Sequence, residues 1–96
     1  MVDVGTIKNR LRINHSKLDN QFAQDIRVAK DELVRVGVSS EKVESEDDSL
    51  IDEAIISYCM MIEASVDSKM YDAYEKQWIQ RRDELRKSTE YKAENV

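Results

Sequence analysis

The sequence predicts a small all-α protein: a four-helix bundle with an acidic loop between its second and third helices and a long C-terminal helix. The 96 residues include no proline and only two glycines, so the strongest helix breakers are nearly absent. Apolar residues also recur every three or four positions along much of the chain. With 41% hydrophobic residues the chain can bury one modest core, so we expect a single domain over residues 1–96.

The first helix is expected from Asp3 to Ile13. Asp3 is a favourable N-cap, and Val4, Ile7 and Leu11 lie on one stripe. A helix this short is not stable in isolation, so its stripe must pack against the rest of the protein.

The second helix has the clearest periodicity. Ser16 and Asp19 have the spacing of a capping box at its start. Gly37 suits the left-handed position of a Schellman end, in which Val38 folds back onto Leu33. The apolar stripe that defines this helix steps by three or four residues through Leu18, Phe22, Ile26, Ala29, Leu33 and Val36.

Residues 38–48 show no helical periodicity and are interpreted as an acidic surface loop. Ser49 and Asp52 then indicate the start of a third helix, with Ser49 as its cap. This helix is apolar around most of its circumference, so it is either central in the fold or completed by a neighbouring subunit. The predicted core of the whole domain comprises Leu11, Leu18, Phe22, Ile26, Leu33, Leu50, Ala54, Ile55, Tyr58 and Ile62.

The fourth helix is expected from Asp67 or Ser68 to about Ser88. Its apolar face fades towards its end, where the last turns are strongly charged. Three aromatic residues share one face of this helix. They indicate either ordinary core or a partner contact, since Tyr and Trp are enriched at interfaces, and both interpretations remain open for Tyr71, Tyr74 and Trp78.

Charge is distributed unevenly along the chain. The formal net charge is −5, so the field of the whole chain does not attract a polyanion. An acidic patch in the middle comprises Glu41, Glu44, Glu46, Asp47 and Asp48. Patches of opposite sign suit subunits that pack side by side, and they equally suit solvated surfaces. The candidate partner or oligomer interface therefore combines the aromatic face with the basic residues beyond it: Tyr71, Tyr74, Trp78, Arg81, Arg82, Arg86, Lys87 and Tyr91.

The sequence predicts no enzyme, no metal site and no cofactor. His15 has no second histidine to complete a metal site, and Cys59 is interpreted as a small core residue. The acidic loop lacks the ligand pattern of an EF-hand, and two glycines cannot build a phosphate-binding loop. We find no signal peptide and no apolar run long enough to cross a bilayer, so no membrane partner is expected.

The order and sequence of several helical segments in this chain resemble those of the head–tail connector (adaptor, or head-completion) proteins of tailed bacteriophages. The resemblance spans most of the chain, roughly residues 2–91. It departs after Tyr58, where related chains often continue with a basic turn that ends in glycine. The segments on which the resemblance rests are residues 4–13, 19–37 and 50–58, followed by Tyr74, Leu85, Glu90 and Tyr91.

The resemblance implies a helical subunit that assembles into a ring beneath the portal of the DNA-filled head, twelvefold in the virion. Such a ring extends the DNA channel and provides the docking platform for the stopper or tail completion protein. Genomic DNA would pass through it without sequence-specific binding. The expected location is the head–tail interface of the virion, and the host cytoplasm during assembly. Residues 86–96 are expected to form a docking arm towards the portal that can be removed without loss of the fold.

Two other classes of function remain open. A small DNA-binding regulator has a similar size, but the acidic balance and the lack of a basic recognition helix argue against it. A helical adaptor that inhibits another protein would also be small and acidic, as this chain is.

Overall fold

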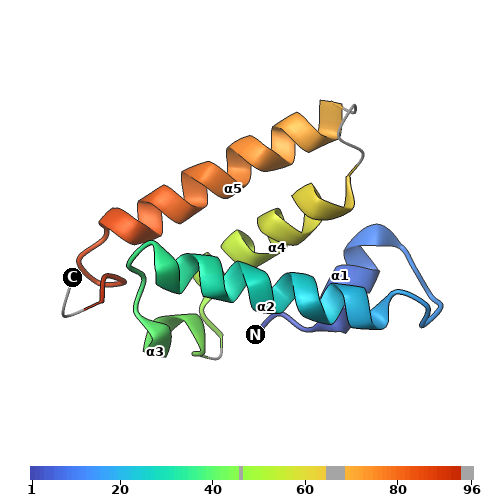
Figure 1. Ribbon diagram of the computed structural model, residues 1–96, viewed down its shortest axis with the longest axis horizontal. Coiled ribbons are helices and arrows are strands. Elements are labelled where there is room, and N and C mark those ends of the chain that lie inside the picture. The colour runs from blue at the N-terminus through green and yellow to red at the C-terminus, as the bar shows by residue number, and fades with distance from the viewer. Residues whose placement is uncertain (46, 65–68, 94–96) are drawn as a thin grey trace.

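The computed structural model describes residues 1–45, 47–64 and 69–93, and these parts confirm the all-α class. They contain no β-strand, only an isolated bridge between Val38 and Lys92. The described residues form five helices (Figure 1): α1 (Val4–Leu11), α2 (Asp19–Arg35), α3 (Ser40–Val43), α4 (Ser49–Glu63) and α5 (Lys69–Lys87).

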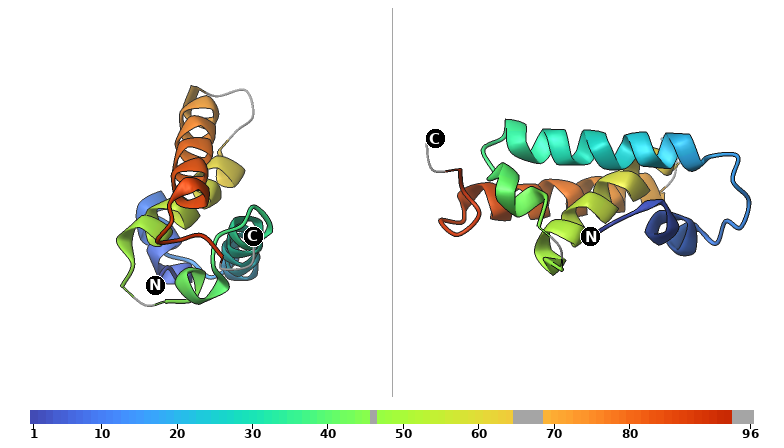
Figure 2. Two further views of the ribbon diagram at one scale, coloured as in Figure 1. Left: turned by 90° about the vertical axis from the view of Figure 1, so that its left-hand side faces the viewer. Right: turned by 90° about the horizontal axis from the view of Figure 1, so that it is seen from below.

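The central helix of the fold is α4. It packs against α5 on one side and α2 on another, while α1 contacts both α2 and α4, and α3 contacts α2. Helix α5 has its main contacts with α4 alone, and Figure 2 shows it projecting away from the other helices. The molecule is elongated, with extents of 41 × 26 × 18 Å. Much of the surface of α5 therefore remains open to solvent.

The ends of α1 follow from local hydrogen bonding. The Asp3 side chain accepts a hydrogen bond from the backbone N–H of Thr6, and the Thr6 hydroxyl oxygen accepts one from the Asp3 N–H. This reciprocal pair confirms Asp3 as the cap. The helix ends at Leu11, two residues before the predicted Ile13, because Arg12 adopts a left-handed conformation with φ 57°.

The two ends of α2 differ in how well the sequence predicts them. The predicted Schellman end is confirmed: Gly37 has φ 107°, its N–H donates to the Val34 carbonyl, and the Val38 N–H donates to the Leu33 carbonyl. The predicted cap at Ser16 is wrong. The helix begins at Asp19, and Leu18 at the cap position provides no side-chain hydrogen bond.

The acidic segment before α4 is not entirely a loop. Residues Ser40–Val43 form the short helix α3, which brings Val43 into the core at 2% exposure. The cap of α4 is Asp48 rather than the predicted Ser49. The Asp48 Oδ1 accepts from the N–H groups of Leu50 (3.1 Å) and Ile51 (3.3 Å). A carboxylate at this position also interacts favourably with the positive end of the helix dipole.

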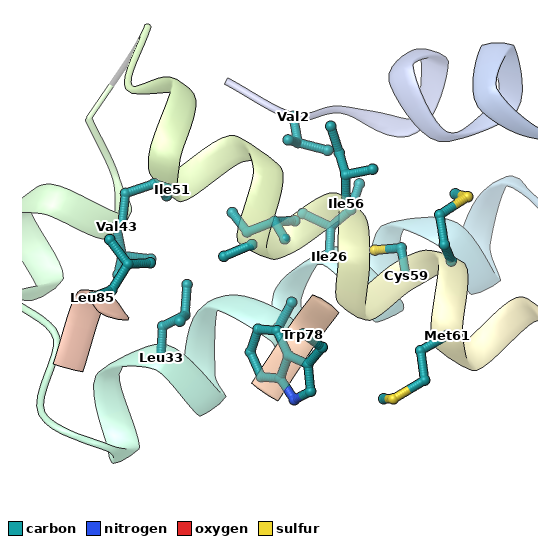
Figure 3. Close-up of a cluster of buried hydrophobic side chains, with 14 of the residues drawn as sticks. Val2, Ile26, Leu33, Val43, Ile51, Ile56, Cys59, Met61, Trp78 and Leu85 are labelled. Carbon is teal, nitrogen blue, oxygen red and sulfur yellow. The ribbon is translucent and has the colours of Figure 1, made fainter. Parts of the chain in front are cut away.

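The core is continuous along α4. Figure 3 shows side chains of different helices meeting there, among them Leu33 of α2, Val43 of α3, Ile51 of α4 and Leu85 of α5. Phe22, Ile26, Leu33, Ala54 and Ile55 are buried as predicted, and Leu11, Leu18 and Tyr58 are partly buried against them.

Two predicted core residues face solvent instead: Leu50 is 48% exposed and Ile62 is 44% exposed. They lie near the two ends of α4. The interior of α4 is thus largely buried within the single chain, and only its ends expose large apolar side chains.

Candidate functional site

The aromatic face of α5 belongs mainly to the core. Trp78 is only 5% exposed, and its ring meets Tyr58 of α4 edge-on at a centroid distance of 5.0 Å. Tyr71 and Tyr74 are half-buried and pack against the same core. Edge-to-face geometry is favourable for aromatic pairs, so these rings fasten α5 to α4. In the single chain Trp78 is not available as a partner contact.

The chain after α5 folds back onto the segment between α2 and α4. The Ser39 N–H donates to the Tyr91 carbonyl at 2.7 Å, and the Ala93 N–H donates to the Gly37 carbonyl at 2.8 Å. Tyr91 is only 7% exposed. Its hydroxyl donates to the Asp48 Oδ1 at 3.1 Å, and the Lys42 ammonium lies 5.6 Å from its ring centre.

This arrangement changes the expectation for the C-terminal segment. Residues 88–93 are part of the folded domain and not a free arm, because they carry a buried aromatic side chain and two long-range backbone hydrogen bonds. The predicted docking arm also includes residues 94–96, which lie outside the described part of the chain.

The acidic patch is divided between structural and exposed residues. Asp48 caps α4 and accepts from Tyr91, and Glu44 forms an ion pair with Lys30 at 3.4 Å. Glu41 and Asp47 are exposed, and Asp47 has a left-handed backbone with φ 60°. Glu46 lies outside the described residues, as does the predicted start of the fourth helix at Asp67 or Ser68.

The basic residues of α5 also differ in their surroundings. Asp83 forms ion pairs with both Arg82 (3.2 Å) and Arg86 (3.5 Å), and these neighbours hold its pKa below the usual range. Arg81 is half-buried, and its Nε has no hydrogen-bond partner in the described parts of the chain. Lys87 is exposed at the end of the helix.

Three hollows surround the 88–93 segment. A small one of about 70 Å³ is mainly apolar and lies between Leu50 of α4 and the end of α5. A second, of about 270 Å³, has three basic side chains in its wall. The third is a wider hollow of about 490 Å³ with charges of both signs, including Glu41 and Lys92. This end of the molecule therefore combines the predicted acidic and basic residues on one small surface, which is the candidate interaction site.

A carboxyl pair at the other end of the molecule was not predicted from the sequence. Asp25 of α2 and Glu63 of α4 interact there, and Gln21 donates to both Glu63 oxygens at 3.0 and 2.7 Å. The Asp25 Oδ2 is buried without a donor among the described residues. Burial, together with the neighbouring Glu63, raises the pKa of Asp25 from its ordinary 3.8 to about 7. The only sequence signal was the placement of Gln21 and Asp25 four residues apart on one helix face.

The other residues that could carry chemistry, Cys59 and His15, have structural roles. Cys59 is fully buried, and burial raises the pKa of its thiol to about 12, so it is not a nucleophile at neutral pH. The His15 Nδ1 accepts from the Lys17 N–H. Among the residues that the structure describes, no group of three or more His, Cys, Asp or Glu side chains is placed to bind a metal ion.

Comparisons with known proteins add no relative: models of protein families, curated protein sequences and solved structures gave no match to this chain. Over the described ranges, none of the helices has the length and apolar character needed to span a bilayer.

Proposed function

We propose that this chain is a structural subunit of a tailed-bacteriophage head–tail connector, which assembles into a ring beneath the portal. In this proposal α1, α2, α4 and α5 are the four-helix bundle of the subunit, with α5 as its long C-terminal helix, and the ring extends the DNA channel towards the stopper or tail completion protein. The ordered helical phrases of the sequence support the family. The exposed apolar side chains support the assembly.

The observation that carries the proposal is the open surface of α4 and α5. Six large apolar side chains are exposed in the described residues, and four of them belong to these two helices: Leu50, Ile62, Met70 and Ile79. Helix α5 is supported mainly by α4, so its outer face is free to meet a second copy. A contact with a second copy would remove these separate apolar side chains from water.

A ring requires heterologous contacts, in which one patch of a subunit meets a different patch of its neighbour. The exposed apolar residues lie at several separate places along α4 and α5, and the charges of opposite sign lie at the C-terminal end. Both features suit contacts between unlike patches. Because charged residues contribute, assembly should weaken as salt rises.

Sedimentation velocity over a range of concentrations, followed by electron microscopy, tests this proposal. We expect oligomers that grow with concentration and rings with a central opening. Ile79→Asp on α5 should reduce assembly at least about tenfold, because it places a charge in an apolar contact. Val34→Asp on α2 is the matched control, since Val34 is 43% exposed and Ile79 is 40% exposed.

A strict monomer at every concentration that also fails to bind a co-expressed portal protein would contradict the proposal. The other open classes predict different results. A DNA-binding regulator would retain duplex DNA on a filter at low salt, and a helical inhibitor would co-purify with a non-structural protein.

A further inference from the structure

The second hollow is a basic pocket where the C-terminal ends of α2 and α5 meet. Its wall consists of Val36, Gly37, Arg86, Lys87 and Lys92, and its volume is about 270 Å³. The left-handed turn at Gly37 and the return of the chain at residues 88–93 together form it. Lys92 is held beside the pocket because its backbone forms the isolated β-bridge with Val38.

The positive charge of this pocket is not balanced within the described parts of the chain. Asp83 faces Arg86 at 3.5 Å, but this single carboxylate also pairs with Arg82 and attracts Lys87. Lys87 and Lys92 are exposed and form no ion pair with any described residue.

Helix dipoles do not account for these cations. A helix C-terminus carries about half a negative charge, and two such ends meet here, against three cationic side chains. The carbonyls of Leu33 and Val34 at the end of α2 already accept from Val38 and Gly37. Positive charge therefore remains for an external anion.

Unbalanced negative charge lies at the same end of the molecule, on the other side of the 88–93 segment. Glu41 and Asp47 are exposed and have no ion-pair partner in the described chain, whereas Glu44 and Asp48 are engaged with Lys30 and Tyr91. Glu41 lines the wider hollow that adjoins the basic pocket. Each subunit thus carries exposed cations around the basic pocket and exposed carboxylates around the hollow that adjoins it.

We propose that the basic pocket of one subunit binds α3 and the nearby Asp47 of a second copy, with Glu41 and Asp47 of that copy facing Lys87 and Lys92. The contact joins unlike patches, so it is heterologous and can repeat around a ring. It rests on the proposed function, because it names a lateral contact of that ring. DNA phosphate is the less favoured occupant, since the chain carries a net charge of −5.

Charge exchange between two variants of the full chain tests this contact. One variant is K87E/K92E, and the other is E41K/D47N, in which Asn is chosen because it tolerates the left-handed backbone at position 47. Sedimentation at low salt should show self-association weakened about tenfold or more in each variant alone, and largely restored when the two are mixed. The K17E/R27E variant, which makes the same charge change at exposed positions just before and within α2, should associate like the unmodified chain.

Circular dichroism of each variant checks that the fold is retained, and K87Q/K92Q replaces the charge-reversed variant if that one unfolds. Unchanged association of both pocket variants would overturn this contact while leaving the ring proposal intact. A strict monomer of the unmodified chain would overturn this contact, and if it also failed to bind a co-expressed portal protein it would overturn the ring proposal as well. Binding of a short DNA duplex that is lost in K87Q/K92Q, without restored association on mixing, would assign the pocket to phosphate and overturn the proposed contact.

Discussion

At the C-terminal end of the molecule, segments far apart in sequence are joined by a buried tyrosine and backbone hydrogen bonds, whereas the opposite end is joined by a pair of carboxyl groups. Tyr91 is 7% exposed and bonded to Asp48 at the first end. At the second, Asp25 and Glu63 meet beside Gln21, close to the exposed Ile62. The difference teaches that one end of this bundle is stabilised at any moderate pH, while the stability of the other depends on a proton.

The largest effect should come from removing residues 88–96. This truncation uncovers Leu85 and Val38 and deletes the buried ring of Tyr91. Loss of a buried aromatic side chain costs about 3–5 kcal/mol, a large part of the stability of a domain this small. Urea denaturation followed by circular dichroism should show a much lower midpoint. A truncated chain with an unchanged midpoint would show that the segment is a dispensable arm, as the sequence alone suggests.

A smaller effect should follow from Tyr91→Phe, which keeps the ring and removes only the hydroxyl that donates to Asp48. A hydrogen bond to a charged group contributes about 1.5 kcal/mol to stability. Asp48 retains its two backbone donors at the start of α4, so the helix itself should persist. Equal unfolding midpoints for Tyr91→Phe and the unmodified chain would mean that burial of the ring, without the hydrogen bond, stabilises this end of the molecule.

The smallest effect, about 1 kcal/mol after allowance for solvent screening, should come from Asp25→Asn, and it should appear only at higher pH. The folded-state pKa of Asp25 is about 7 against an ordinary 3.8. The folded protein therefore binds a proton more tightly than the unfolded chain, and stability falls as pH rises from about 4 to 7. The amide stays neutral, so the variant should match the unmodified chain at pH 4 and exceed it at pH 8.

Denaturation at these two pH values, with Asp31→Asn on the exposed side of α2 as control, measures this difference. If Asp25→Asn shifts stability equally at pH 4 and pH 8, the carboxyl pair does not share a proton and the contrast between the two ends disappears.

Sequence patterns predicted the features that depend on neighbouring residues. The Asp3 cap and the Schellman end at Gly37 both follow from residues within one or two turns, and both are confirmed. Choosing between Asp48 and Ser49 as a cap was beyond the sequence, since adjacent residues are both good caps. A helix that is apolar all round also has no pattern to show that Leu50 and Ile62 are its exposed positions.

Features that depend on distant residues were not predictable in this way. The short helix α3 spans only four residues, too few for any periodicity, and it is positioned by burial of Val43. The role of Tyr91 depends on Asp48, and that of Asp25 depends on Glu63, residues about forty positions away in each case. The candidate site at the C-terminal end was therefore predicted by its residues, while its division into structural and exposed members required the fold.

The return of residues 88–93 to the 37–48 segment has a consequence for synthesis. During synthesis, α4 can pack against α1 and α2 before it packs against α5, and the wall that contains Lys92 exists only once residues 88–93 have left the ribosome. Chains that stop before this segment lack one wall of the basic pocket. The last segment to fold back would therefore set the moment at which a nascent chain first offers the complete basic pocket.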